Sequence, residues 1–307
     1  MKEKPTVTRV YQNPHLDSTR WRVYQPRSDD IVVSTAYKAG TTWTQMIIYG
    51  LLFPVVDENT PPLGIASLWL DERFVMPLEG VAALLEAQTH RRFTKTHLPL
   101  DGLPYFEEVK YVVVARDARD VFMSLWNHYA NYTDDQYYRL NHDHGYETEL
   151  IPRCPDDIHE LWSQWMNKGW FEWESEGYPF WGNLHHTQTW WNYHNLPNIL
   201  LIHYNALKED IHGQVQRLAD FLDIELSEEA LDRVVHMAQF DNMKSFFKEH
   251  VDDQLKQGFK GGSDAFIYKG TNDRWKEVLT TSELQMYEQK KAEVLTPDCA
   301  EWLEYRV

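Results

Sequence analysis

IVVSTAYKAGTTW, residues 31–43, joins a β-branched apolar run to a short polar segment and then to the start of a second apolar run. The first run predicts a buried strand, and the second predicts a helix that begins at Thr41. Gly40 permits the tight turn between them, and the amides that open a helix have no partners within it. The segment is therefore a candidate anion site, with Lys38 and the hydroxyls of Thr41 and Thr42 as further donors.

The same segment also has an interpretation without a ligand, as an ordinary strand–turn–helix corner with a solvated lysine. It is not the nucleoside-triphosphate loop, because that motif places its lysine directly after a glycine and before Ser or Thr. Here Lys38 precedes Gly40. On these residues alone the two interpretations are evenly matched.

Further apolar runs predict more strands, and helical patterns follow three of the four. The predicted strands cover residues 31–35, 92–95, 110–115 and 199–204. The predicted helices cover residues 41–53, 119–129 and 208–222, a segment capped by Ser227, and a final helix over 281–295. Continuous apolar strands that alternate with helices predict an α/β fold with a central parallel sheet flanked by helices and ligands at the carboxyl ends of the strands.

Composition excludes several classes of protein. The 307 residues include 30 Lys plus Arg and 47 Asp plus Glu, a net charge of −17, which argues against nucleic-acid binding and against docking on an anionic membrane. The longest apolar run, residues 46–56, is far short of the ~20 residues of a membrane span. The N-terminus does not resemble a signal peptide. We expect a cytoplasmic protein in which Cys154 and Cys299 are reduced, although one disulfide is possible.

No linker or repeat divides the chain, so we expect one domain over residues 1–307. Residues 131–198 interrupt the strand–helix rhythm with a Trp-rich insertion. Its tryptophans are interpreted mainly as packing, and partly as a wall or lid over an acceptor pocket. Tyr132 and Tyr138 follow the helix that contains Ser124, and they are candidates to face an acceptor.

Two more segments contain chemically suggestive residues. Arg116 ends a predicted strand and Ser124 follows two helical turns later, so the pair could hold a phosphate. In isolation, a surface salt-bridge lattice is the favoured explanation of Arg116 and its charged neighbours. Phe93-Thr-Lys95-Thr-His97-Leu-Pro99 places a histidine just after a strand. A lone histidine is more often structural than catalytic, but this position is where an α/β active site lies.

Together these segments resemble the cytosolic-type sulfotransferases. That family shows Tyr-Pro-Lys-Ser-Gly-Thr-Thr-Trp, then Lys-Thr-His-Leu-Pro, then a strand-ending arginine with a serine eight positions later. This chain has Tyr-Lys-Ala-Gly-Thr-Thr-Trp at 37–43, Lys-Thr-His-Leu-Pro at 95–99, and Arg116 with Ser124. The resemblance covers about residues 31 to 290, with further matches at 204–210, 239–244 and 268–276. The Trp-rich insertion is similar to that of bacterial relatives described as glycolipid sulfotransferases.

The resemblance implies transfer of a sulfuryl group from 3′-phosphoadenosine 5′-phosphosulfate (PAPS) to a hydroxyl or amine of a small-molecule or lipid-like acceptor, with adenosine 3′,5′-bisphosphate as product. It implies His97 as the base, Lys38 as the residue that stabilises the leaving phosphate, and Lys95 beside them. The implied donor-binding residues are Lys38, Ala39, Gly40, Thr41, Thr42, Trp43, Arg116, Ser124, Tyr204, Phe240, Tyr268, Lys269 and Gly270. No metal is implied.

The chain departs from the family pattern at several of these positions. The loop before Gly40 lacks the family's proline and serine, and Ala238-Gln239 changes the segment on the adenine side. Tyr268 stands where the family has an arginine for the 3′-phosphate, and Arg274 is a candidate to restore that charge. The family's small dimer contact is incomplete over residues 276–285, so we expect a monomer or a weak homodimer.

Three other functions remain open at this stage. A P-loop kinase would need Gly-Lys-Ser/Thr, which is absent. A non-catalytic nucleotide-binding protein would not need His97 and Lys38. A metal hydrolase built on residues 142–144 or 185–186 is the weakest reading. Aromatic residues favour a flat or lipid-like acceptor, whereas an acidic stretch would favour a cationic one, namely Asp134, Asp135, Asp143, Glu147 and Glu149.

Overall fold

A parallel sheet forms the centre of the computed structural model, which describes residues 4–142 and 149–304. In this part of the chain the strand order is β2-β3-β1-β4-β5, and every neighbouring pair is parallel. The strands are β1 (Ile31–Thr35), β2 (Ser67–Trp69), β3 (Phe93–Thr96), β4 (Lys110–Ala115) and β5 (Ile199–His203). The expected α/β fold with a central parallel sheet is confirmed.

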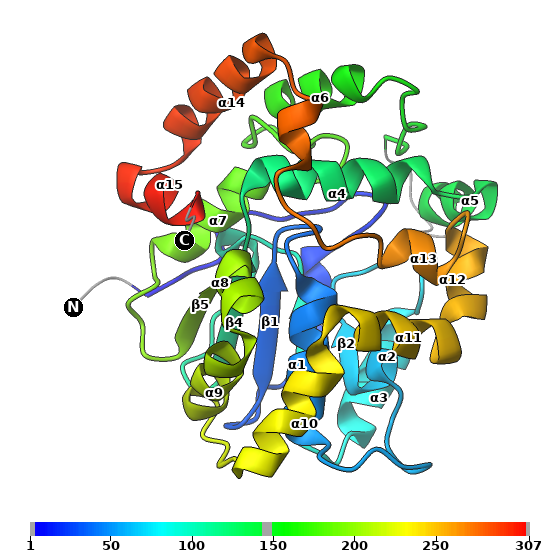
Figure 1. Cartoon of the computed structure of the whole chain (residues 1–307), viewed down its shortest axis with the longest axis vertical. Helices are drawn as coiled ribbons and strands as arrows, with labels where there is room; N and C mark the ends of the chain where they lie inside the picture. Colours follow the sequence, from blue (N-terminus) through cyan, green and yellow to red (C-terminus); the bar gives the residue numbers. More distant parts are fainter. Residues whose placement is uncertain (1–3, 143–148, 305–307) are drawn as a thin grey trace.

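Each face of the sheet is covered by its own layer of helices. Successive residues of β1 alternate between two cores, with Val32 in one and Ile31 and Val33 in the other, as the pleat of a strand requires. The core that contains Ile31 is closed by α1 (Thr41–Leu52), α9 (Ile211–Phe221), α10 (Glu228–Ala238) and α11 (Phe240–His250). In Figure 1, α1 and α10 lie in front of the sheet.

The opposite core is larger and includes most of the aromatic residues. Helices that contribute to it are α3 (Leu78–Ala87), α4 (Ala118–Ala130), α5 (Asp134–His142), α6 (Ile158–Asn167), α7 (Asn183–Trp191), α14 (Thr281–Val294) and α15 (Pro297–Leu303). Shorter helices connect the layers: α2 (Leu63–Ala66), α8 (Tyr204–Glu209), α12 (Asp252–Gly258), α13 (Ser263–Phe266), and the 3₁₀ turns η1 (Ser18–Val23), η2 (Leu100–Gly102) and η3 (Arg274–Glu277). No helix in the described ranges combines the length and apolar composition that crossing a bilayer requires.

The predicted elements differ from the structure in several places, and three of these differences have a local cause. The strand β2 was not predicted, because three residues are too few to show a periodicity. The helix predicted over residues 208–222 is two helices, since the Asp210 side chain accepts a hydrogen bond from the Gly213 amide at 2.8 Å and so begins α9 anew. The helix over 281–295 is not the last one, because Pro297 opens α15.

The tryptophans of residues 131–198 are mainly structural. Trp162, Trp165, Trp181 and Trp190 are each at most 2% exposed. Trp162 packs edge-on against Phe122 of α4, with ring centroids 4.8 Å apart. This segment therefore adds aromatic side chains to the core that α4 shares with one face of the sheet. Both cysteines are free, in agreement with the reduced state we expected.

Candidate functional site

A cavity of about 470 Å³ lies at the carboxyl edge of the sheet, and all five strands contribute to it. Trp69 ends β2, Lys95 lies in β3, and Arg116 and Tyr204 directly follow β4 and β5. The loop after β1 completes the lining. Parallel strands bring their carboxyl ends to one edge, which is why residues far apart in the sequence meet in this carboxyl-edge cavity.

The structure brings together nearly all of the residues predicted for the site. Those that line the cavity are Lys38, Gly40, Thr41, Thr42, Trp43, Lys95, His97, Arg116, Ser124, Tyr204, Phe240, Tyr268, Lys269 and Gly270. Ala39 does not line it, because its side chain is fully buried in the core. The lining also includes residues that the sequence did not single out for the site: Tyr37, Trp69, His128, Lys208, Asp241, Met243, Phe266, Ile267 and Thr271.

The amino end of α1 is built to receive an anion. Gly40 caps this helix with φ of 126° and without a side-chain hydrogen bond, and the first turn contains no acidic residue. The first amides of α1 therefore have no capping acceptor. A Cβ at Gly40 would lie 3.1 Å from the ring of Tyr204. Glycine is required here both for its backbone conformation and for this close approach.

Lys38 sits in the same loop with a left-handed backbone, φ of 69°. Such a conformation costs a non-glycine residue on the order of 1–3 kcal/mol and is kept where the surroundings enforce it. Burial, together with the positive charges of Lys95 and Arg116, lowers the pKa of Lys38 to about 7. Lys95 lies 4.7 Å from the ring of Trp69, and burial lowers its pKa to about 8.

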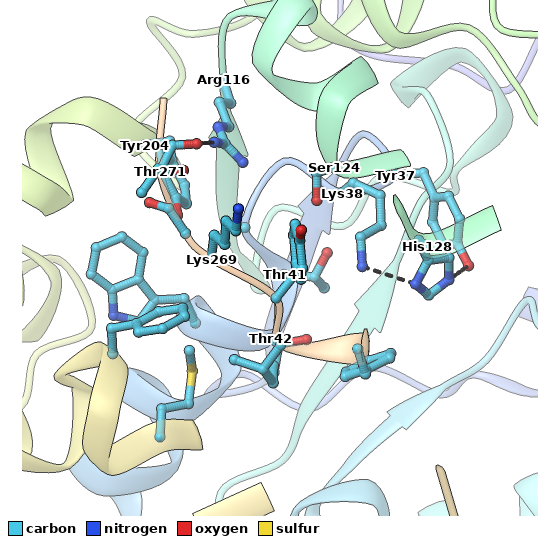
Figure 2. A pocket seen from close by; sticks show the side chains of 18 of the residues that line it. Tyr37, Lys38, Thr41, Thr42, Arg116, Ser124, His128, Tyr204, Lys269 and Thr271 are labelled. Atoms are coloured by element: carbon cyan, nitrogen blue, oxygen red, sulfur yellow. Dashed lines mark hydrogen bonds between the residues drawn. The ribbon is translucent and has the colours of Figure 1, made fainter. Parts of the chain in front are cut away.

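Arg116 forms a second cationic centre in the cavity. Its guanidinium stacks 4.1 Å from the ring of Tyr204 and donates to the Thr271 carbonyl at 3.0 Å and to Asn272 at 2.8 Å. The side chain is 4% exposed, yet its Nε has no hydrogen-bond partner among the described residues. Figure 2 shows Arg116, Ser124 and Lys269 pointing into the pocket. Arg116 therefore lines the cavity with a guanidinium whose hydrogen-bonding capacity is not fully used.

Arg274 lies close to Tyr268, where the family has an arginine. Its guanidinium lies 5.4 Å from the Tyr268 ring, and its buried Nε is also without a hydrogen-bond partner in the part of the chain that the structure describes. Burial lowers the pKa of Arg274, and the neighbouring charge of Arg116 lowers it further. The carboxylate of Asp120 partly offsets this repulsion, since it interacts electrostatically with both guanidinium groups.

His97 has the geometry of a neutral base. Its Nδ1 lies 2.9 Å from the Thr35 carbonyl, which can only accept, so Nδ1 carries the proton and Nε2 keeps a lone pair. The rings of Tyr37, Trp69 and Trp181 surround the imidazole. Burial, with the nearby charge of Lys95, holds the pKa of His97 well below its ordinary value.

Three aromatic residues line the cavity close to Gly40 and Gly270. Trp43 and Tyr204 meet edge-to-face with ring centroids 5.2 Å apart, and Trp43 donates through Nε1 to the Ala238 carbonyl at 2.7 Å. Phe240 approaches Gly270 so closely that a Cβ there would lie 2.8 Å from the Phe240 ring. These fixed rings provide flat apolar faces of the kind on which a base can stack.

The two tyrosines predicted to face an acceptor do not line the cavity. Tyr138 is 61% exposed and stacks on His142 at the surface. Tyr132 is buried behind Tyr37, with their hydroxyl oxygens 3.2 Å apart. Both tyrosines follow the helix that contains Ser124, but their place in the sequence does not determine the direction in which each side chain points. The prediction that these two side chains face an acceptor in the cavity was wrong.

The metal-hydrolase alternative gains no support from the described residues, which contain no group of three potential metal ligands. His186 is buried with its Nε2 2.9 Å from the Ser34 hydroxyl, and His185 lies 3.1 Å from Asp101. Of the other histidine pair, His144 lies outside the described residues, as do Asp143 and Glu147 of the acidic stretch. Asp134 pairs at the surface with Arg153.

Comparisons with known proteins agree with this geometry. The chain matches the model of the sulfotransferase domain over residues 28–295. A glycolipid sulfotransferase of Mycobacterium bovis is 32% identical, over 98% of this chain and 95% of that protein. Human sulfotransferase 1E1 is 28% identical over 84% of this chain and 81% of its own length.

Two solved structures share the fold. A retinol dehydratase in complex with androsterone and the inactive cofactor PAP superposes with a TM-score of 0.70 at 22% identity, covering 95% of this chain and 88% of that one. A mouse sulfotransferase complexed with PAP superposes with a TM-score of 0.64 at 17% identity, covering 94% and 92%. Both likenesses confirm the α/β architecture.

We expect His97 to stay neutral, with its proton on Nδ1, as the pH falls through 6.5, because burial and Lys95 disfavour the imidazolium. Long-range ¹H–¹⁵N NMR of histidine-labelled protein at about pH 6 reports both the charge and the tautomer. The signal is assigned by its loss in His97→Asn. A titration midpoint at or above 6.5, or an Nε2–H tautomer, would contradict the assignment.

Proposed function

Because the chain belongs to the sulfotransferase family, we propose that it transfers the sulfuryl group of PAPS to a hydroxyl or amine of a small-molecule or lipid-like acceptor in the carboxyl-edge cavity. The observation that supports this most directly is the juxtaposition of an uncapped helix amino end, two cationic centres and a neutral imidazole in one cavity. A phosphosulfate, a second phosphate and an acceptor hydroxyl each have a chemically matched partner there.

The residues present fit this donor. The amides at the start of α1, with Lys38, Thr41 and Thr42, would hold the 5′-phosphosulfate. The guanidinium of Arg116 would contact the 3′-phosphate, together with Ser124, Lys269 and the Gly270 amide. The adenine would lie among the rings of Trp43, Tyr204 and Phe240. The bound donor supplies an activated sulfuryl group on a phosphate leaving group.

The chain's own residues then have distinct tasks. His97 would accept the proton of the acceptor hydroxyl at Nε2, while its Nδ1–H stays on the Thr35 carbonyl and keeps the ring in place. Lys38 and the α1 amides would stabilise the negative charge that develops on the leaving phosphate. Lys95, held over Trp69, would stabilise the acceptor oxygen as it loses its proton. Transfer of this kind depends on positioning and charge stabilisation, by analogy with phosphoryl transfer.

The lining favours a neutral or acidic acceptor over a cationic one. Asp241 is the one carboxylate among the described residues that line the cavity, against six cationic side chains: Lys38, Lys95, Arg116, Lys208, Lys269 and Arg274. Tyr37, Trp69 and Phe266 add flat apolar surface. Relatives described as glycolipid sulfotransferases point in the same direction, toward an acceptor with a lipid-like or aromatic portion.

In this proposal the chain is one domain, and residues 131–198 pack against the residues that line the acceptor end of the cavity. Trp181, which belongs to this segment, packs against Tyr37 and His97 with ring centroids 5.1 and 5.7 Å apart. The segment therefore acts on the acceptor through the residues it supports rather than as an exposed lid.

Arg116→Ala is expected to weaken binding of adenosine 3′,5′-bisphosphate by roughly 1.5–3 kcal/mol, about one to two decades in affinity, because a charge-assisted phosphate contact is lost. Adenosine 5′-phosphate, which has no 3′-phosphate, should lose much less. Calorimetric titration of both nucleotides measures the difference. Equal losses for the two would mean that Arg116 supports the fold and does not recognise the 3′-phosphate.

Transfer of labelled sulfate from PAPS to a panel of phenols, sterols, glycolipids and amines tests the function itself. His97→Asn should reduce turnover of neutral acceptors by ~10²–10⁴, because asparagine is polar but cannot act as the base. Its melting temperature and bisphosphate affinity should stay close to those of the unaltered protein. Full activity in this variant would remove His97 from the mechanism, and nucleotide binding without transfer to any acceptor would favour a non-catalytic nucleotide-binding protein.

A further inference from the structure

Lys38 does not extend freely into the cavity, because its ammonium is held by an imidazole on a different element. The Lys38 Nζ lies 3.1 Å from Nδ1 of His128, which belongs to α4. The other ring nitrogen of His128, Nε2, lies 2.8 Å from the hydroxyl of Tyr37. Figure 2 shows the imidazole between the two side chains, which are neighbours in the sequence. His128 therefore contacts two consecutive residues of the loop after β1.

The hydrogen-bond chain assigns a tautomer to His128. A lysine ammonium can only donate, so Nδ1 of His128 must accept from Lys38, and the ring proton must lie on Nε2. Nε2–H then donates to the Tyr37 oxygen, and the Tyr37 hydroxyl is free to donate to Tyr132, 3.2 Å away. Each of these buried polar groups is thereby satisfied. This tautomer is the opposite of the one assigned to His97.

His128 is suited to remain an acceptor. It is 2% exposed, and it is surrounded by the rings of Tyr37, Tyr132, Phe259 and Phe266. The titratable groups that act on it are Lys38, His15, His97 and Lys95, and burial together with Lys38 holds the pKa of His128 well below its ordinary value. A neutral imidazole keeps its Nδ1 lone pair for the ammonium.

Lys38 needs such an acceptor because its other charged neighbours disfavour its ammonium form. Burial, Lys95 and Arg116 lower its pKa to about 7, and its Nζ also lies 5.0 Å from the Phe266 ring. The left-handed backbone at Lys38 also requires contacts that hold the loop in place. The pair of bonds from His128 to Tyr37 and Lys38 provides such contacts.

We propose that His128 is a positioning residue, which holds Lys38 in its ammonium form and aims it within the carboxyl-edge cavity. The inference rests on the proposed function, in which Lys38 supplies positive charge to the leaving phosphate. It adds a residue that acts through Lys38 and not on the acceptor. Its position one helical turn after Ser124 places both side chains on the same face of α4.

The test compares His128→Phe with His128→Asn in the nucleotide-free protein. Phenylalanine fits among the surrounding rings but offers no acceptor, whereas the Asn Oδ1 can accept from Lys38 where Nδ1 now stands. Trace acetylation of Lys38 with acetic anhydride, followed by mass spectrometry across a pH series, reports the fraction of unprotonated amine. The unaltered protein should show a midpoint at about 7.

The midpoint should fall by about one pH unit in His128→Phe, because a hydrogen bond to a charged donor is lost. His128→Asn should stay close to the unaltered protein. An unchanged midpoint in a folded His128→Phe would overturn the inference, and so would equal shifts in both variants, since these would reflect a general disturbance.

A measurement on the unaltered protein covers the case in which His128→Phe does not fold. At about pH 6, where Lys38 is protonated, ¹H–¹⁵N NMR should show His128 as the neutral Nε2–H tautomer, and an Nδ1–H tautomer or an imidazolium would overturn the proposal. Neither measurement uses a nucleotide or an acceptor. Absence of sulfuryl transfer would therefore defeat the proposed function while leaving the role of His128 in the charge state of Lys38 to be judged separately.

Discussion

The uncapped amino end of α1 is the constraint on which the site depends. Gly40 leaves the first amides of the helix without a capping side chain, and its backbone conformation brings the loop against Tyr204. These amides face a cavity from which the nearby strands also present cations. Because unsatisfied amides and clustered positive charges are both unfavourable in isolation, an anionic ligand that satisfies them together would stabilise the arrangement.

Two histidines of the cavity, His97 and His128, differ in their hydrogen bonding although both are buried. His97 and His128 are both buried and neutral, but their hydrogen-bond partners select opposite tautomers. The lone pair of His97 is left on Nε2, where the proposed mechanism uses it, whereas that of His128 is directed at Lys38. Burial, with repulsion from Lys95 and Arg116, lowers the pKa of Lys38 to about 7, so its ammonium is less favoured than that of a solvated lysine.

The sequence predicted the parts of the fold and site that are encoded locally. The β1 loop and Arg116 follow strands rich in apolar β-branched residues, and His97 follows the shorter strand β3, so their place at the carboxyl edge could be inferred from connectivity. The position of Trp69 could not be inferred in this way, because β2 has three residues, too few to be recognised as a strand from the sequence. His128, Lys208 and Thr271 join the cavity through tertiary packing, and nothing in their local sequence signals it. Tyr138 is the opposite case: it is close to Ser124 in the sequence, yet its side chain is exposed at the surface and does not line the cavity.

The central claim is that the chain's own amides and cations bind the nucleotide of the sulfuryl donor. Calorimetric titration with adenosine 3′,5′-bisphosphate, with and without a chelator, tests it without knowledge of the acceptor. The account predicts one nucleotide bound per chain, an affinity that falls as salt rises, and no effect of the chelator. Absence of binding, or binding that strictly requires Mg²⁺, would contradict it.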